Sequence, residues 1–354
     1  MRGNRDDIRQ LLDRIVNEVD LTPRRDYWMV RTDRGKNYDP FLQHGIVALR
    51  MPYVSTAFVS QMENMNMPEM EYINHIKAHF LGLINNPNIA EMEDLQEIRE
   101  PSTLSKRASQ LYSFCLKMRS GDIVLIPSSD SSNISIGVVD GDEMLIDERL
   151  NNQYPIARRV RWINQISKNR LEPGLYRAIG NHQAMTNISK YSESLERNFG
   201  SCFMMDGVCH YVITFNSEQI PADKFFGLGQ TLLRTLQLIS EQYDLQIDVR
   251  DINLTMNLNS PGRIDFKSTM LIAVLMMAIL TSCSGGDIAY DNVMHGVSET
   301  FTELVQKVSD FFGVEGDNAQ MSNTISDYLN GMDAQAVEKF NQNSMEALRQ
   351  VANE

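Results

Sequence analysis

The chain has 354 residues, of which 42% are hydrophobic and 22% charged, a composition typical of folded globular proteins that excludes wholesale disorder. This length predicts two or three domains. The formal net charge is −13, and residues 287–354, with 12 acidic and 3 basic residues, account for most of it. Acidity therefore weighs against nucleic-acid binding mainly for the C-terminal part.

The four cysteines form no C-x-x-C pair, which argues against a zinc or redox motif and suits a reducing compartment. We therefore predict no metal and no cofactor. Residues 1–25 contain no apolar run, so a secretory signal is not expected.

Residues 5–20 carry apolar side chains on one stripe and charges opposite, which predicts an amphipathic helix within an N-terminal segment, residues 1–24. A first domain is predicted for residues 25–171. Short strand patterns there flank a helical stretch at 54–118, which favours a small, strongly bent β-barrel with helical insertions. The strands are expected at 27–32, 45–51, 122–127, 134–139, 144–146 and 157–162.

Residues 172–266 predict an α/β connector module. It opens with helical material around 177–197, and Asp206-Gly207 then marks a hairpin. A long helix at 221–243 precedes a strand at 248–258. The tail, residues 288–354, is predicted helical and oligomerising, because apolar residues from 297 to 311 recur at spacings of 4, 3, 4 and 3, the seam of a coiled coil or bundle. Two more helices are expected around 318–330 and 334–351. The predicted fold class is thus α+β.

The stretch from Ser268 to Gly286 has no charged residue, although its unbroken apolar part covers only Met270–Leu280. Our main interpretation is a short transmembrane helix at 267–287. A helix buried inside a soluble domain is the alternative, and Leu280–Cys283, similar to a lipoprotein signal, is a third. Basic residues before the stretch and acidic residues after it place the N-terminal region in the cytoplasm of a bacterium, beneath its inner membrane.

Small polar residues close this stretch, and hydroxyl groups are suited to a wet pore. We therefore expect Thr281, Ser282 and Ser284 to line a pore in a homo-oligomer, for which a tetramer is our guess, in contact with the lipid bilayer. A plain anchor with a bundled tail is the alternative.

Residues 25–165 carry a set of motifs in a recognisable order: Y-W-M-V-R at 27–31, D-P-F-L-Q-H-G-I-V-A-L at 39–49, F-C-L-K-M-R-S-G-D-I-V-L-I-P at 114–127, S-I-G-V-V at 135–139 and A-R-R-V-R-W at 157–162. This set resembles the Mrr-N/EVE-like (PUA-related) domains of bacterial restriction and defence proteins. The resemblance implies a reader of modified bases or nucleotides with an aromatic-lined pocket. Arg50-Met51 stands where that family has Gly-Trp, so the chain departs from the family at the usual aromatic cage.

Trp28, Trp162 and Tyr38 are candidates for such a pocket, and core packing is the alternative, which we favour for Trp162. Basic side chains are candidates for phosphate contacts, with a solvated face as the alternative. These candidate ligand residues are Arg31, Arg34, Lys36, Arg158, Arg159 and Arg161.

The domain order of the whole chain resembles the channel-forming effectors of the Hailong anti-phage system. This resemblance implies an antiviral membrane protein, an ion channel gated by a nucleotide or single-stranded DNA oligomer that a partner nucleotidyltransferase makes. The alternative is a soluble nucleic-acid-binding, oligomeric adaptor of a restriction-type defence system.

We predict no enzyme activity. The chain has no P-loop, and no lysine follows Glu or Gln by two positions, as nuclease motifs require; Asp265-Phe266-Lys267 comes nearest. His75 and His79 stand at helical spacing, which favours a surface pair over a metal site.

Overall fold

The computed structural model describes residues 5–336, apart from 90, 146–153, 169–170, 172–174, 177–178, 181–182, 199, 218–220, 258–261, 285–295 and 314. The chain forms two compact units. We call Arg24–Ser194 the central unit, and Met1–Pro23 with Leu195–Glu354 the terminal unit.

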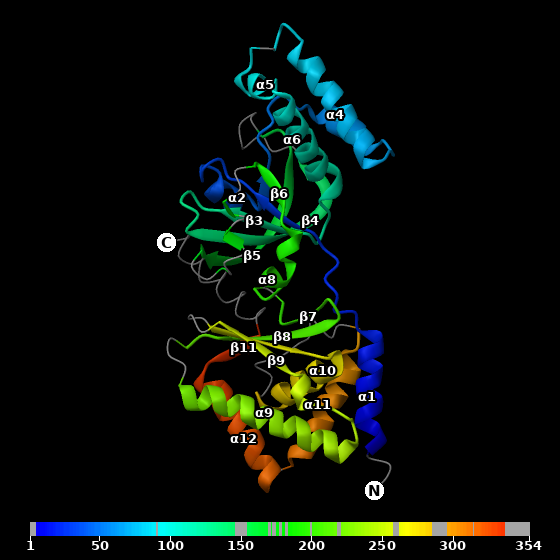
Figure 1. The fold of residues 1–354 in the computed structure, drawn as a ribbon, viewed down its shortest axis with the longest axis vertical. Helices are drawn as coiled ribbons and strands as arrows, with labels where there is room; N and C mark the ends of the chain where they lie inside the picture. Colours follow the sequence, from blue (N-terminus) through cyan, green and yellow to red (C-terminus); the bar gives the residue numbers. More distant parts are fainter. Residues whose placement is uncertain are drawn as a thin grey trace. The chain divides into compact units, whose positions relative to one another are not determined.

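The central unit is built on a mixed six-stranded sheet with the strand order β2-β5-β4-β3-β1-β6, in which only the pair β1–β3 is parallel (Figure 1). Its elements are β1 (Tyr27–Val30), α2 (Tyr38–His44), β2 (Ile46–Ala48), α3 (Thr56–Glu63), α4 (Glu69–Ile84), α5 (Glu93–Glu97), α6 (Pro101–Tyr112), a π-helical turn (Ser113–Lys117), β3 (Ile123–Pro127), β4 (Asn133–Leu145), β5 (Ala157–Ser167) and β6 (Met185–Asn187). A short helix, α8 (Ser192–Glu196), spans the boundary to the terminal unit.

The sheet is curled but open, so the predicted small, strongly bent β-barrel is wrong. Its two edges, β2 and β6, are three residues long each, and among the described strands β2 pairs with β5 and β6 with β1. Closure needs the first and last strands to pair along their length. Edge strands of three residues are too short to pair in this way. The helical segment 54–117 is inserted between β2 and β3.

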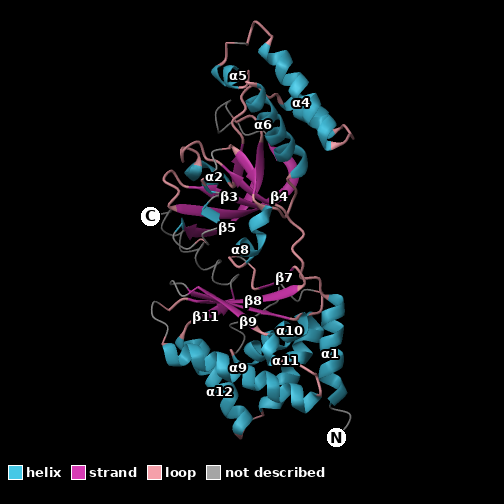
Figure 2. Ribbon diagram, viewed as in Figure 1, coloured by secondary structure: helices cyan, strands magenta, loops and turns pink. Residues whose placement is uncertain are grey.

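The terminal unit is a two-layer structure, with an antiparallel sheet of order β11-β8-β10-β9 to which β7 adds beside β8. Its helices lie on one face of this sheet (Figure 2). The elements are α1 (Arg5–Glu18), β7 (Cys202–Met205), β8 (Val208–Phe215), α9 (Ala222–Tyr243), β9 (Asn253–Asn257), β10 (Gly262–Ser268), α10 (Met270–Cys283), α11 (Ser298–Phe312), α12 (Asp317–Gly331) and β11 (Ala334–Ala336).

Helix α10 is the centre of the helical layer, and the predicted transmembrane helix is therefore wrong. Every residue from Ala273 to Leu280 is fully buried, and α10 packs against α1, α9, α11, α12, β8 and β10. Neighbours on all sides explain why no polar stripe exists. Its 14 residues reach only about 21 Å, against roughly 30 Å for a bilayer core.

Among the described residues, no helix combines the length and the apolar character that crossing a bilayer requires. The interpretation of this stretch as a buried helix is the one that the packing supports.

The 4-3-4-3 seam predicted in the tail is the inner face of α11. Phe301, Leu304, Val308 and Phe311 are buried in the same core as α1 and α10. The seam thus closes an intramolecular bundle. The helix predicted at 318–330 is α12, whereas the one predicted at 334–351 begins with the strand β11 and otherwise lies outside the described residues.

Candidate functional site

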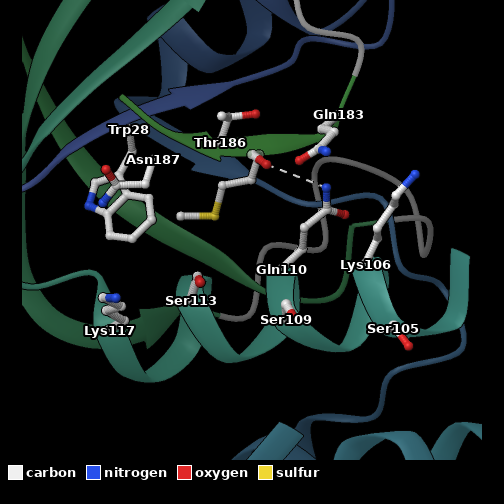
Figure 3. Close-up of a pocket in the computed structure, with 11 residues that line it drawn as sticks. Trp28, Ser105, Lys106, Ser109, Gln110, Ser113, Lys117, Gln183, Thr186 and Asn187 are labelled. Carbon is white, nitrogen blue, oxygen red and sulfur yellow. Dashed lines mark hydrogen bonds between the residues drawn. The ribbon is translucent and has the colours of Figure 1, made fainter. Parts of the chain in front are cut away.

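A groove of about 350 Å³ lies in the central unit between the helical segment 101–117 and the edge strand β6 (Figure 3). We call it the β6 groove. One wall is α6 with its π-helical turn, the other is β6, and Trp28 of β1 contributes to the floor. The lining residues are Trp28, Ser105, Lys106, Ser109, Gln110, Ser113, Lys117, Gln183, Met185, Thr186 and Asn187.

The helical wall presents a row of hydroxyl groups. Ser105, Ser109, Ser113 and Lys117 recur every four residues, which places them on one face of a helix. The π-helical turn continues α6 without a break and so extends the row as far as Lys117. These residues add hydroxyl groups and one ammonium group to the lining of the helical wall.

The floor of the β6 groove is held by the carboxylate of Asp122. Trp28 is buried, and its Nε1 donates to Asp122 Oδ2 at 2.8 Å. The same oxygen accepts from the backbone N–H of Arg119 at 3.0 Å, and Oδ1 accepts from that of Asp26 at 2.9 Å. One buried carboxylate therefore ties the floor to the end of the helical wall.

Gln110 bridges the two walls of the groove. Its Nε2 donates to the backbone carbonyl of Met185 over 3.4 Å, which is a long contact (Figure 3). Only 8% of Gln110 is exposed, and in the described part of the chain its buried Oε1 has no hydrogen-bond partner. A buried acceptor without a donor is unfavourable and calls for a reason.

The groove carries positive charge at its two ends. Figure 3 shows Lys117 near Trp28 and Asn187, and Lys106 near Gln183. Both lysines are exposed, and the carboxylate of Glu69 lies 4.0 Å from the Nζ of Lys117. Within the described ranges, no Asp or Glu lines the groove itself.

Two of the predicted ligand residues, Arg159 and Arg161, are exposed on β5, but they lie on the sheet face opposite the groove. Directly paired residues share a face of a sheet. The pairs Trp28–Val124, Val124–Gly137 and Gly137–Trp162 place both tryptophans on one face. Arg161 pairs with Val138, next in sequence to Gly137, and therefore points the other way, as does Arg159.

Arg158 is fully buried, and its guanidinium is bound by backbone carbonyls. Nε donates to Phe114 O at 3.1 Å, Nη2 to Cys115 O at 2.7 Å, and Nη1 to Asp142 O. Burial lowers its pKa. Since Phe114 and Cys115 belong to the π-helical turn, Arg158 anchors the end of the wall that carries Lys117.

The remaining basic candidates lie after β1, outside the groove lining. Arg31 donates to the carbonyl of Ile179, and burial lowers its pKa. Arg34 and Lys36 are exposed, and Lys36 Nζ lies 3.9 Å from Asp33.

The residues predicted to line a pore, Thr281, Ser282 and Ser284, lie at the end of α10. Ser282 Oγ lies 2.7 Å from Ser309 Oγ of α11, and Ser284 Oγ donates to Thr281 O at 3.4 Å. The hydroxyl groups of Ser282 and Ser284 thus make contacts within and between the helices of one chain. No described helix could cross a membrane, which corrects the expectation of an ion channel.

His75 and His79 of α4 lie against Phe58 of α3 in a second hollow of about 370 Å³. The His79 ring stacks on Phe58 at 3.7 Å, and burial, with His75 nearby, lowers the pKa of His79. In the described part of the chain, no group of three or more His, Cys, Asp or Glu residues could hold a metal ion.

Asp265, the aspartate of the near-miss nuclease motif, belongs to a buried polar cluster in the terminal unit. Its Oδ2 lies 2.8 Å from Nε of Arg197 and 2.9 Å from Nδ1 of His210, whose ring stacks on Phe203. Removal of a partner would leave the buried carboxylate without compensation, which is strongly unfavourable. The cluster thus explains the aspartate structurally.

Sequence reasoning missed the β6 groove, although part of its signal was present. Serines at 105, 109 and 113 followed by Lys117 form a polar stripe on a predicted helix. The opposite wall had no such signal, because β6 is three residues long and was not predicted as a strand.

Comparison with known proteins adds one match. Residues 74–187 match the model of a family described as a domain of unknown function (DUF8426). This segment lies inside the central unit and contains every lining residue of the β6 groove except Trp28. No curated protein and no solved structure matches the chain.

Proposed function

We propose that the central unit binds single-stranded nucleic acid, with one nucleotide unit in the β6 groove. The observation that carries this proposal is the charge pattern of the groove. A lysine stands at each end, hydroxyl and amide groups line the length between them, and no carboxylate is among the described lining residues. Such a wall favours a polyanion with hydrogen-bonding groups along it.

The spacing of the lysines favours a strand over an isolated phosphate. Lys106 and Lys117 are eleven positions apart along a continuous helical segment, which corresponds to roughly 16 Å of helix. A single phosphate group is too small to span this distance. A strand that runs along the groove and beyond its ends would present different, non-adjacent phosphates to the two lysines, with one nucleotide unit in the groove itself.

The size and the floor of the groove suit one nucleotide unit. Its volume of about 350 Å³ is at the lower end for small-ligand sites. The buried Trp28 ring forms part of the lining, and the unpaired Oε1 of Gln110 supplies an acceptor for a hydrogen-bond donor of the ligand.

A peptide added to the edge of β6 is the competing ligand class, since edge strands accept such additions. Two observations count against it. The carbonyl of Met185 on the groove side is already engaged by Gln110. The lysines and the absence of a described carboxylate in the lining also favour an anion over a neutral backbone.

The wider role that we propose is that of a nucleic-acid-binding adaptor in a defence system. The support for this wider role is the resemblance of residues 25–165 to the domains of restriction and defence proteins.

The direct test is a titration of the full chain into fluorescently labelled single-stranded oligonucleotides of mixed sequence, followed by anisotropy at several salt concentrations. We expect saturable binding. The logarithm of the association constant should fall linearly with the logarithm of the salt concentration. The absence of binding at about 100 µM protein, the weak limit of non-specific association, would overturn the proposal. Binding of an unstructured peptide at the same groove in place of nucleic acid would also overturn it.

A further inference from the structure

The hairpin β7–β8 of the terminal unit brings two cysteines together. Its turn is Asp206-Gly207, where both residues have positive φ, as a tight two-residue hairpin turn requires. The Sγ atoms of Cys202 in β7 and Cys209 in β8 lie 3.7 Å apart. This is the distance of two thiols in contact, and a disulfide would shorten it to about 2.05 Å.

The strand register explains the contact. Cys202 pairs with Tyr211, and Met204 pairs with Cys209, so the two cysteines are diagonal neighbours on one face of the hairpin. That face belongs to the core under the helices. Among the described strands, β7 pairs only with β8, so a small shift of β7 would not disturb a second strand.

We propose that Cys202 and Cys209 form a modification site, at which a peroxide oxidises the two thiols to a disulfide within the hairpin. This inference is independent of the β6 groove and goes beyond the proposed function.

The reaction proceeds in two balanced steps. The thiolate of Cys202, which is 8% exposed and so the more accessible of the pair, attacks hydrogen peroxide. Its sulfur gains one oxygen as a sulfenic acid, and hydroxide leaves. The thiolate of Cys209 then attacks the sulfenic sulfur, the S–S bond forms, and a second hydroxide leaves. The two hydroxides take up the two thiol protons as water, so both sulfurs are oxidised and the peroxide is reduced.

The other two cysteines provide internal controls. Burial raises the pKa of Cys115 to about 12 and that of Cys283 to about 11, which suppresses the reactive thiolate. The Cys283 thiol contacts Ser322 Oγ at 3.4 Å. Among the described residues, neither of these thiols contacts another thiol, and Cys202 and Cys209 are the pair whose sulfur atoms are in range.

The test is to treat the native full chain with hydrogen peroxide, block free thiols with N-ethylmaleimide, and map the products by mass spectrometry. Before the blocking step we expect an intact mass lower by two hydrogens. After it, the mapped products should include a cross-linked peptide that pairs Cys202 with Cys209 and that dithiothreitol reverses. The Cys202→Ser and Cys209→Ser variants should each lose this cross-link. The double variant Cys115→Ser/Cys283→Ser should keep it.

Two results would overturn the proposal. One is over-oxidation of Cys202 to a sulfinic acid without a cross-link in the native wild-type chain. The other is a native chain that gives the same mixture of cysteine pairings as the chain in denaturant. This would show that the fold does not select the pair Cys202–Cys209.

Discussion

The indole Nε1 of Trp28 donates a hydrogen bond to Oδ2 of Asp122 at 2.8 Å, and through this contact the floor of the β6 groove is joined to its helical wall. The same carboxylate accepts backbone bonds from Asp26 and Arg119, so three donors converge on one buried group. Arg119 follows the π-helical turn that carries Lys117. The groove is therefore held in shape by a charge that lies beneath it.

We predict that Asp122→Asn lowers the free energy of unfolding by about 2–3 kcal/mol, since charge-assisted bonds are lost and an amide NH₂ would face backbone donors. Urea denaturation in a Trp162→Phe background, with Trp28 as the remaining tryptophan, measures both stability and the environment of that ring. An unchanged urea midpoint would show that the convergence of donors on Asp122 contributes little.

Substitution of Gln110 should affect nucleic-acid binding much more than it affects the stability of the fold. Replacing Gln110 with Met removes the unpaired Oε1 and one long hydrogen bond, so we expect the free energy of unfolding to change by less than about 1 kcal/mol in either direction. Binding of single-stranded nucleic acid should weaken, because the polar contact in the middle of the groove is gone. Thermal denaturation and anisotropy on the same samples give both quantities. An unchanged affinity for single-stranded nucleic acid would show that Gln110 does not belong to the binding site.

Features that depend on local sequence were predictable. The stripe of Ile8, Leu12 and Ile15 in α1 and the Asp206-Gly207 turn follow from periodicity and from backbone preferences, and both are present. The strands expected at 134–139 and 144–146 form one long strand, β4, with an irregularity between Val139 and Met144. Neighbouring β5 pairs with both parts and so joins them.

Features that depend on distant neighbours were not predictable. The apolar stretch Met270–Leu280 has the same composition whether lipid or protein surrounds it, and only the positions of α1, α11 and α12 decide between them. Arg158 looked like Arg159 and Arg161 in sequence, yet it faces the π-helical turn while they face away. The alternation of basic and apolar residues along β5 was visible in the sequence. The sequence did not show which face of the strand other elements would cover.

Two charge-matched double variants test which face of the central sheet binds nucleic acid. Lys106→Ala/Lys117→Ala removes the charges at the ends of the groove, and Arg159→Ala/Arg161→Ala removes two charges from the opposite face. We expect the lysine variant to lose about tenfold in affinity and to reduce the salt slope by about 1.4, and the arginine variant to stay within about twofold of wild type. The reverse ranking would move the site to the face that carries Arg159 and Arg161.

The buried position of α10 predicts a large effect of truncation at its centre. Leu275 is fully buried, so Leu275→Ala should lower the free energy of unfolding by about 2–5 kcal/mol. Phe226 of α9, which is 70% exposed, provides the control, and Phe226→Ala should cost less than about 0.5 kcal/mol. Urea unfolding followed by circular dichroism compares the two. Equal effects would contradict the central position of α10.

Tyr53 gives a prediction for alkaline pH. Burial, the main cause, raises the pKa of its phenol to about 12, and its hydroxyl has no hydrogen-bond partner in the described part of the chain. The ordinary value in an unfolded chain is about 10. Between pH 10 and 12 the unfolded chain therefore loses this proton while the folded chain keeps it, so stability falls as pH rises through this window. Cys115, with a pKa of about 12, acts in the same direction from about pH 9 upward.

Tyr53→Phe removes the phenol but keeps the ring that packs edge-on against Phe80 at 5.3 Å. At pH 7 we expect a free energy of unfolding equal to or higher than that of wild type, because an unpaired buried hydroxyl is lost. Above pH 10 the advantage of the variant should grow, since one of the groups whose ionisation favours the unfolded chain is absent. Urea midpoints at pH 7, 9 and 10.5 measure this trend. A gap between variant and wild type that stays constant or narrows as pH rises would show that Tyr53 ionises as readily in the folded chain as in the unfolded one.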